Sequence, residues 1–197
     1  MGSITKRILL VRHGHHAEVG HVLSGRSAIA LSDEGRTQAA AVARYLAATQ
    51  VDAIYGSPRP RTIETAEAIA ASRGLAVQRA DALDEVDFGR FAGRRFADLD
   101  GDRDWARWNV ERATARCLGG ETMGEAIDRA AAFLFALGAG TIVCVSHCDI
   151  IRGVVAHVLG LPLHRIFSLG CDPASLTRLD FDGQDVRVDT LNEQPWR

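Results

Sequence analysis

The stretch RILLVRHG, residues 7 to 14, decides the fold because a short apolar run ends directly in a charged turn that contains glycine. Such a run, bounded by polar residues, is typical of a strand that is buried on both faces. The next residues, Arg12, His13 and Gly14, stand where this strand would leave the sheet. We therefore expect a strand at 7–11 that delivers these three residues to a sheet edge, where open parallel sheets bind their ligands.

The same unit recurs along the chain as apolar runs that alternate with segments of helical periodicity. Ser32 is a plausible N-cap for the first helix, Gly74 is the expected end of the second, and Asp182-Gly183 marks the turn of a terminal hairpin. The expected helices are 32–49, 61–74, 122–138 and 149–160, and the expected strands are 51–57, 75–80, 141–146 and the two arms of the hairpin at 174–191.

Strands that alternate with helices favour a mostly parallel sheet covered on both faces, so the predicted fold class is a three-layer α/β/α sandwich with an antiparallel edge from the hairpin. A chain of 197 residues fits a single domain spanning 1–197. The segment from about 87 to 120 has no clean period and reads as an excursion that partly covers the active site. Trp105 and Trp108 lie three residues apart in it, and we expect them to pack a lid helix onto the body.

Composition restricts the partners. Hydrophobic residues make up 47% and charged residues 24% of the chain, and the formal net charge is −2. These values give no reason to expect nucleic acid or a membrane as a partner, since both favour a clustered basic surface. The absence of a signal-like start and of paired CxxC cysteines favours a cytoplasmic protein with reduced thiols. The hairpin or an exposed edge strand could support a homodimer.

Polar residues follow each predicted strand and should meet at one sheet edge. Arginine donates to phosphate through a planar fork, a neutral imidazole can attack phosphorus, and a carboxylic acid can protonate the leaving oxygen. This combination suits phosphoryl transfer on a small phosphorylated substrate. The residues in question are Arg12, His13, Arg59, Arg61, Glu85 and His147.

Six spaced motifs resemble those of the histidine phosphatase superfamily, the phosphoglycerate-mutase-like proteins of branch 1. In chain order they are LLVRHG, LSDEGRTQA, SPRPRTIETA, LDEVDFG, GGET and VSH, and they extend from about Ile8 to Leu179. The resemblance implies that His13 is a nucleophile that becomes phosphohistidine and that Glu85 is the proton donor. It also implies substrate binding by Arg12, Arg61, His147, Ser24 and Gly25, with no metal and no cofactor.

Several positions depart from that family pattern. His15, His16 and Val19 stand where the family often has glutamate, threonine and asparagine, and Cys148 replaces the usual glycine after Ser-His. We expect His15 and His16 to lie at the pocket rim or in a plain surface loop. Arg152 fits either the pocket or a salt bridge, whereas Cys148 fits a small buried residue better than a thiol of low pKa.

The predicted function is a metal-independent phosphomonoesterase. A cofactor-dependent phosphoglycerate mutase and a non-catalytic phosphate-binding module remain as alternatives. The histidines near residue 13 also raise the question of zinc, but neither an HExxH motif nor a Cys/His quartet is present.

Overall fold

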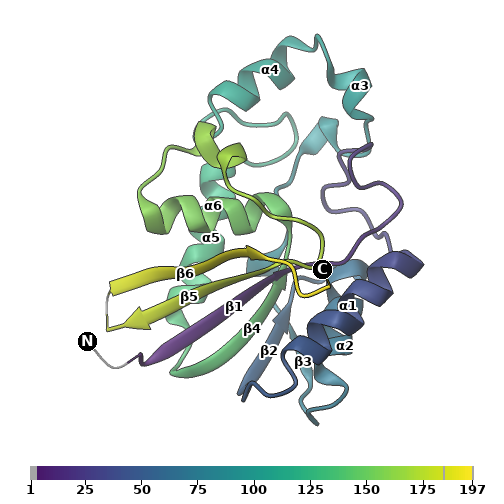
Figure 1. The fold of residues 1–197 in the computed structure, drawn as a ribbon. Coiled ribbons are helices and arrows are strands. Elements are labelled where there is room, and N and C mark those ends of the chain that lie inside the picture. Colours follow the sequence, from purple (N-terminus) through teal and green to yellow (C-terminus); the bar gives the residue numbers. More distant parts are fainter. Residues whose placement is uncertain (1–3, 184, 197) are drawn as a thin grey trace.

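The computed structural model describes residues 4–183 and 185–196 of the chain, and its centre is one six-stranded sheet (Figure 1). The strand order is β3-β2-β4-β1-β5-β6. The first four strands in that order run parallel, β5 is antiparallel to β1, and β6 is antiparallel to β5. The strands are β1 (Lys6–Arg12), β2 (Ala53–Gly56), β3 (Val77–Arg79), β4 (Gly140–Ser146), β5 (Leu176–Asp182) and β6 (Asp185–Glu193).

Helices cover both faces of the sheet, which confirms the predicted three-layer α/β/α class. The α-helices are α1 (Asp33–Tyr45), α2 (Pro60–Ala70), α3 (Phe96–Leu99), α4 (Arg103–Val110), α5 (Met123–Ala136) and α6 (Cys148–Leu159). Short 3-10 turns are η1 (Asp81–Leu83), η2 (Gly89–Phe91) and η3 (Leu163–Ser168). No helix among the described residues is long and apolar enough to cross a bilayer.

Strand β1 shows how the sequence fixes the layers. Its side chains alternate between the faces, so Leu9 and Val11 pack with α1 and α2 while Ile8 and Leu10 pack with α5 and α6. Because all four are at most 2% exposed, the continuous apolar run is explained by burial on both sides.

The expected elements are present with shifted ends. Ser32 caps α1 by accepting a hydrogen bond from the Gly35 backbone N–H at 3.1 Å. The prediction that the second helix closes at Gly74 was wrong, since α2 ends at Ala70. The Arg73 backbone N–H donates to the Ala70 carbonyl at 2.9 Å, and this tighter i to i+3 bond replaces the α-helical pattern before Gly74.

The irregular segment 87–120 contains η2, α3 and α4. Figure 1 shows α3 and α4 standing apart from the sheet at the top of the molecule. Trp108 on α4 is 1% exposed, and Trp105 stacks on it with ring centroids 5.3 Å apart. Helix α4 therefore packs onto the body through its tryptophans, but with only eight residues it is too short to show helical periodicity in the sequence.

Candidate active site

His13 follows β1 and lies on the wall of a cavity of about 350 Å³, although its side chain is only 3% exposed. Its Nδ1 atom lies 2.8 Å from the Gly14 carbonyl oxygen, which can only accept a hydrogen bond. Nδ1 therefore carries the proton, and the neutral ring keeps a lone pair on Nε2. Burial, followed by the positive charges of Arg12 and Arg61, holds the pKa of His13 well below its ordinary value. The Nε2 atom of His13 is thus unprotonated at neutral pH.

Gly14 explains why glycine follows the histidine. A Cβ atom at Gly14 would lie 2.5 Å from the carbonyl oxygen of Gly35, in the first turn of α1. The Gly14 backbone N–H donates to the Thr65 hydroxyl of α2 at 3.1 Å. The turn after β1 is therefore pressed between two helices, and this close packing fixes the position of the His13 ring.

Two arginines flank His13. Arg12 donates to the Cys171 carbonyl at 2.6 Å, and Arg61 on α2 donates to the carbonyls of Gly25 and Ser27 at 2.6 and 2.9 Å. Within the described part of the chain, neither guanidinium forms an ion pair with a carboxylate, and both Nε atoms are buried without a partner. Two uncompensated cations beside one imidazole favour an anion at this inner end of the cavity.

His147 lies at the C-terminal end of β4, and its ring centroid is 5.3 Å from that of His13. Its Nδ1 accepts a hydrogen bond from Arg61 Nη2 at 3.1 Å, so Nε2 carries the proton and donates to the Ser57 hydroxyl at 2.7 Å. The side chain is fully buried behind the cavity wall. In this arrangement His147 orients Arg61, and its direct contact with substrate stays a prediction.

Glu85 lies after η1 and faces the cavity with 8% of its surface exposed. Burial, and next the negative charge of Asp149, raise the pKa of Glu85 to about 8. One carboxyl oxygen accepts the Val86 backbone N–H at 3.0 Å. Glu85 is therefore mostly protonated at neutral pH, as a general acid must be before it donates.

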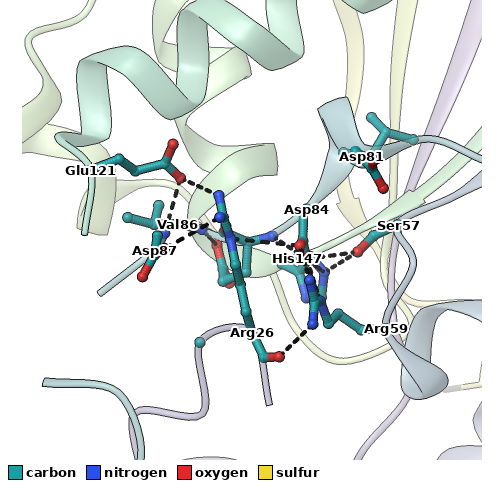
Figure 2. A network of polar contacts seen from close by, with 12 residues as sticks. Arg26, Ser57, Arg59, Asp81, Asp84, Val86, Asp87, Glu121 and His147 are labelled. Carbon is teal, nitrogen blue, oxygen red and sulfur yellow. Dashed lines mark hydrogen bonds and ion pairs between the residues drawn. The ribbon is translucent and has the colours of Figure 1, made fainter. Parts of the chain in front are cut away.

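A polar network holds the Glu85 loop in place (Figure 2). Arg26 donates to the Glu85 carbonyl at 2.8 Å and to Glu121 at 2.7 Å, and it pairs with Asp87 at 3.4 Å. Arg59 binds the neighbouring Asp84 through its Nε atom at 2.8 Å. Sequence reasoning placed Arg59 with the arginines at the strand ends, but its side chain serves this network and does not line the cavity.

The outer end of the cavity is formed by other elements. Arg112 is sandwiched between the rings of Trp108 and Phe167, with its guanidinium carbon 4.4 Å from each centroid. Arg152 on α6 donates to the Leu169 carbonyl at 2.8 Å and makes no salt bridge within the described chain, so it is a pocket residue. The other outer residues are Phe88, Phe96, Trp105, Asp149 and Asp172, and the predicted Ser24 and Gly25 also line the wall.

The two histidines that follow Gly14, His15 and His16, point to different places. His16 is 3% exposed, lines the cavity and lies 5.1 Å from His13 between ring centroids. His15 turns away and its Nδ1 lies 2.9 Å from the hydroxyl of Ser32, the N-cap of α1. The described residues contain no group of three or more histidine, cysteine or acidic side chains arranged to hold a metal ion.

The cysteines gave one correct and one wrong prediction. Cys144 is a core residue with no exposed surface, as expected from its strand position. Cys148, however, is half-buried and lines the cavity, so its expected place as a small buried residue was wrong. It is the first residue of α6, and its thiol and the Arg12 guanidinium both hydrogen-bond to the Cys171 carbonyl. A hydrogen bond with Cys171 and burial raise the pKa of the Cys148 thiol.

Comparison with known proteins identifies the family of the chain. The family model for the histidine phosphatase superfamily (branch 1) matches residues 8–194. The chain belongs to this superfamily. Its named relatives are phosphatases, and the chain is a phosphatase enzyme.

Two named relatives illustrate the similarity. The chain is 32% identical to phosphoserine phosphatase 1 of Hydrogenobacter thermophilus, covering 94% of this chain and 92% of the relative. It is 30% identical to glucosyl-3-phosphoglycerate phosphatase of Mycobacterium tuberculosis, covering 95% and 94%. The solved structure of mycobacterial glucosyl-3-phosphoglycerate phosphatase superposes with a TM-score of 0.85 at 30% identity, covering 96% of this chain and 99% of that chain.

Proposed function

We propose that this phosphatase hydrolyses phosphomonoesters of small metabolites through a phosphohistidine on His13, without a metal ion. The observation that carries the proposal is the unprotonated Nε2 of His13 beside two arginines that lack carboxylate partners. Nε2 attacks phosphorus while the bond to the leaving oxygen breaks. Arg12 and Arg61 stabilise the charge on the phosphoryl oxygens, and their cations take the place that a metal fills in other phosphatases.

Glu85 supplies the protons that the two half-reactions need. In the first, its neutral carboxyl protonates the departing alkoxide. In the second, the resulting carboxylate accepts a proton from the water that attacks the phosphohistidine, so Glu85 and His13 return to their starting states. The pKa of about 8 supports this role because the group holds a proton at neutral pH and can still release it.

A small polar leaving group fits the outer end of the cavity. A space of about 350 Å³ has room for a metabolite. Asp149 and Arg152 lie three positions apart on one face of α6 and both line this space, so a leaving group with its own charge would find a partner. Two relatives are named for phosphoserine and glucosyl-3-phosphoglycerate, which are small phosphorylated metabolites.

Rapid acid-free quenching of the wild type with a ³²P-labelled phosphomonoester tests the mechanism. The expected result is a labelled protein whose label is stable to base and released by acid, as a phosphoramidate is. His13→Ala should carry no label, whereas the control His21→Ala, at an exposed histidine of the same loop, should label normally.

Two further measurements could contradict the proposal. Steady phosphate release should persist after treatment with a chelator, and activity that disappears and is restored by zinc would contradict the metal-independent step. Isomerisation of phosphoglycerate without steady phosphate release would instead indicate a mutase. A panel of phosphorylated metabolites, scored by phosphate release, then identifies the preferred leaving group.

A further inference from the structure

Asp84 is a buried carboxylate beside the active site that has no part in the proposed reaction. Only 4% of its surface is exposed. Figure 2 shows it next to Ser57, Arg59 and His147. Its oxygens accept hydrogen bonds from the Arg59 guanidinium at 2.8 and 3.0 Å and from the Glu85 backbone N–H at 3.0 Å. Arg59 thus compensates the buried charge on one side, and the remaining side-chain contact of Asp84, to Ser57, leads towards His147.

Ser57 connects Asp84 to His147. The Ser57 hydroxyl donates to Asp84 Oδ1 at 3.1 Å, because a carboxylate can only accept. The same hydroxyl oxygen accepts the Nε2 proton of His147 at 2.7 Å. Both Ser57 and His147 have no exposed surface. The hydrogen bonds therefore run in one direction, from the imidazole through the hydroxyl to the carboxylate, and they fix the tautomer that leaves Nδ1 free to accept from Arg61.

We propose that Asp84, acting through Ser57, is a positioning residue that stabilises the protonated form of His147 when a phosphoryl dianion occupies the cavity. The proposal deepens the proposed function and rests on it for the identity of the dianion. The proton comes from solvent and binds to Nδ1, while Nε2 keeps its proton and its bond to Ser57. Asp84 Oδ1 lies 3.7 Å from Nε2, close enough to act as the counter-charge.

The charges around His147 explain why a ligand is needed. Burial and neighbouring cations hold the pKa of His147 well below its ordinary value, and the carboxylate of Asp84 lies within ion-pair distance as an opposing charge. A dianion beside Arg12 and Arg61 would offset those cations and favour the imidazolium. The titratable and charged groups that face the ring are Arg12 and His13 at the end of β1, Arg59 and Arg61 at the start of α2, and Asp84.

Protonation would also change the role of Arg61. Its Nη2 now donates both to Nδ1 of His147 and to the Gly25 carbonyl. A proton on Nδ1 removes the lone pair that Arg61 uses there, so the N–H of Arg61 and the new N–H of His147 both become donors for the phosphoryl oxygens. Substrate binding and proton uptake are then one coupled event.

Calorimetry of sulfate binding to His13→Ala at pH 6.5 measures this coupling without turnover. Sulfate is a dianion with no titrating proton at this pH, and the removal of His13 leaves its own protonation out of the result. Glu85, with a pKa of about 8, stays protonated throughout. Titrations in buffers of different ionisation enthalpy give the number of protons taken up, and we expect close to one.

Three second-site variants in the His13→Ala background decide whether Asp84 is responsible for the proton uptake. Asp84→Asn removes the charge and keeps the shape, and Ser57→Ala cuts the connection while Asp84 stays. Both should lower proton uptake. Sulfate affinity should fall about tenfold for each unit by which the substitution lowers the pKa of His147 in the sulfate complex. Asp87→Asn is the matched control, because it removes a carboxylate from the same network without touching Ser57 or His147.

Each outcome has one meaning. Equal proton uptake in the parent, Asp84→Asn and Ser57→Ala would overturn the role of Asp84, and so would a parent that takes up no proton. If Asp84→Asn does not fold, Ser57→Ala carries the test. His16, whose pKa is lowered to about 4, contributes the same background to every variant. Normal proton uptake combined with no phosphoenzyme in the wild type would reject the proposed function alone.

Discussion

The inner and outer ends of the cavity are formed by different kinds of structure. At the inner end, Arg12, His13 and Arg61 are held by backbone carbonyls and by the ends of parallel strands. At the outer end, the walls come from the irregular segment 87–120 and from the residues around Phe167, a ring that is 60% exposed. If the proposed function is right, changes in the outer segments should alter the preference for leaving groups more than the reaction at His13.

Replacement of Glu85 should cause the largest loss of activity, and the loss should depend on whether the leaving group needs a proton. We expect Glu85→Gln to lower kcat/KM for an alkyl phosphate by about 10²-fold or more, the usual contribution of a general acid. For para-nitrophenyl phosphate kcat/KM should fall far less, since its leaving phenolate is stable without a proton and kcat/KM reports only the steps up to its departure; kcat should fall for both substrates, because both share the second half-reaction. Steady-state rates on both substrates measure the difference, and equal losses of kcat/KM would remove Glu85 from the role of acid.

The same carboxyl makes stability depend on pH. Its pKa is 4.5 in an unfolded chain and about 8 in the folded state, so the folded form is favoured below pH 4.5 and loses that advantage as pH rises towards 8. Glu85→Gln has no proton to lose. The fall in Tm between pH 5 and pH 9 should therefore be smaller for the variant than for the wild type in thermal melts, and an equal fall would show that the carboxyl ionises freely in the folded state.

Arg12 tests whether the inner end needs a planar donor or only a positive charge. Lysine keeps the charge but cannot hold the Cys171 carbonyl and a phosphoryl group with one rigid fork. We expect Arg12→Lys to lower kcat/KM by about 10²-fold, the typical loss for one transition-state donor, on every substrate alike. A loss confined to one leaving group would place Arg12 at the outer end instead.

The same division explains what the sequence could predict. The strands that carry His13 and His147 were predictable because buried parallel strands are continuous apolar runs, and their carboxyl ends must meet at one edge. Helix α1 was predictable from Ser32 and the apolar spacing after it. These are local signals, and each lies within a few residues of the side chain that it positions.

The pairing of side chains could not be predicted in the same way. Arg59 binds Asp84 across 25 positions, and His147 reaches Ser57 across 90, so no local pattern records either contact. Glu85 was picked out by its motif, but its neighbours in the acidic run gave no sign that Arg26 and Arg59 hydrogen-bond to this loop from distant parts of the chain. Arg112 belongs to the aperiodic segment, where its stacking on Trp108 depends on how a short helix folds back.

Replacement of Arg152 should affect binding at the outer end of the cavity and leave the reaction at the inner end unchanged. Its guanidinium has one carbonyl partner, and a charged hydrogen bond to a leaving group is worth about 1.5 to 3 kcal/mol. We expect Arg152→Gln to raise KM about tenfold for a metabolite that carries a carboxylate, with little change for para-nitrophenyl phosphate. Phosphoserine and phosphoethanolamine form a matched pair, since only the first has the carboxylate, and equal effects on both would argue against this contact.

Replacement of Asp149 should cause the smallest change in activity, and it tests whether a charge at the outer end influences the acid at the inner end. It lies at the outer end, 3.7 Å from Arg112, yet its charge is the second cause, after burial, of the raised pKa of Glu85. Asp149→Asn removes that charge, so the pKa of Glu85 should fall from about 8, and the alkaline limb of kcat/KM against pH should move to lower pH by less than about one unit. Since burial remains, the limb should still lie well above the ordinary range of a carboxyl group. An unmoved limb would mean that burial alone sets this pKa, and that the outer end can change its charges without retuning the acid.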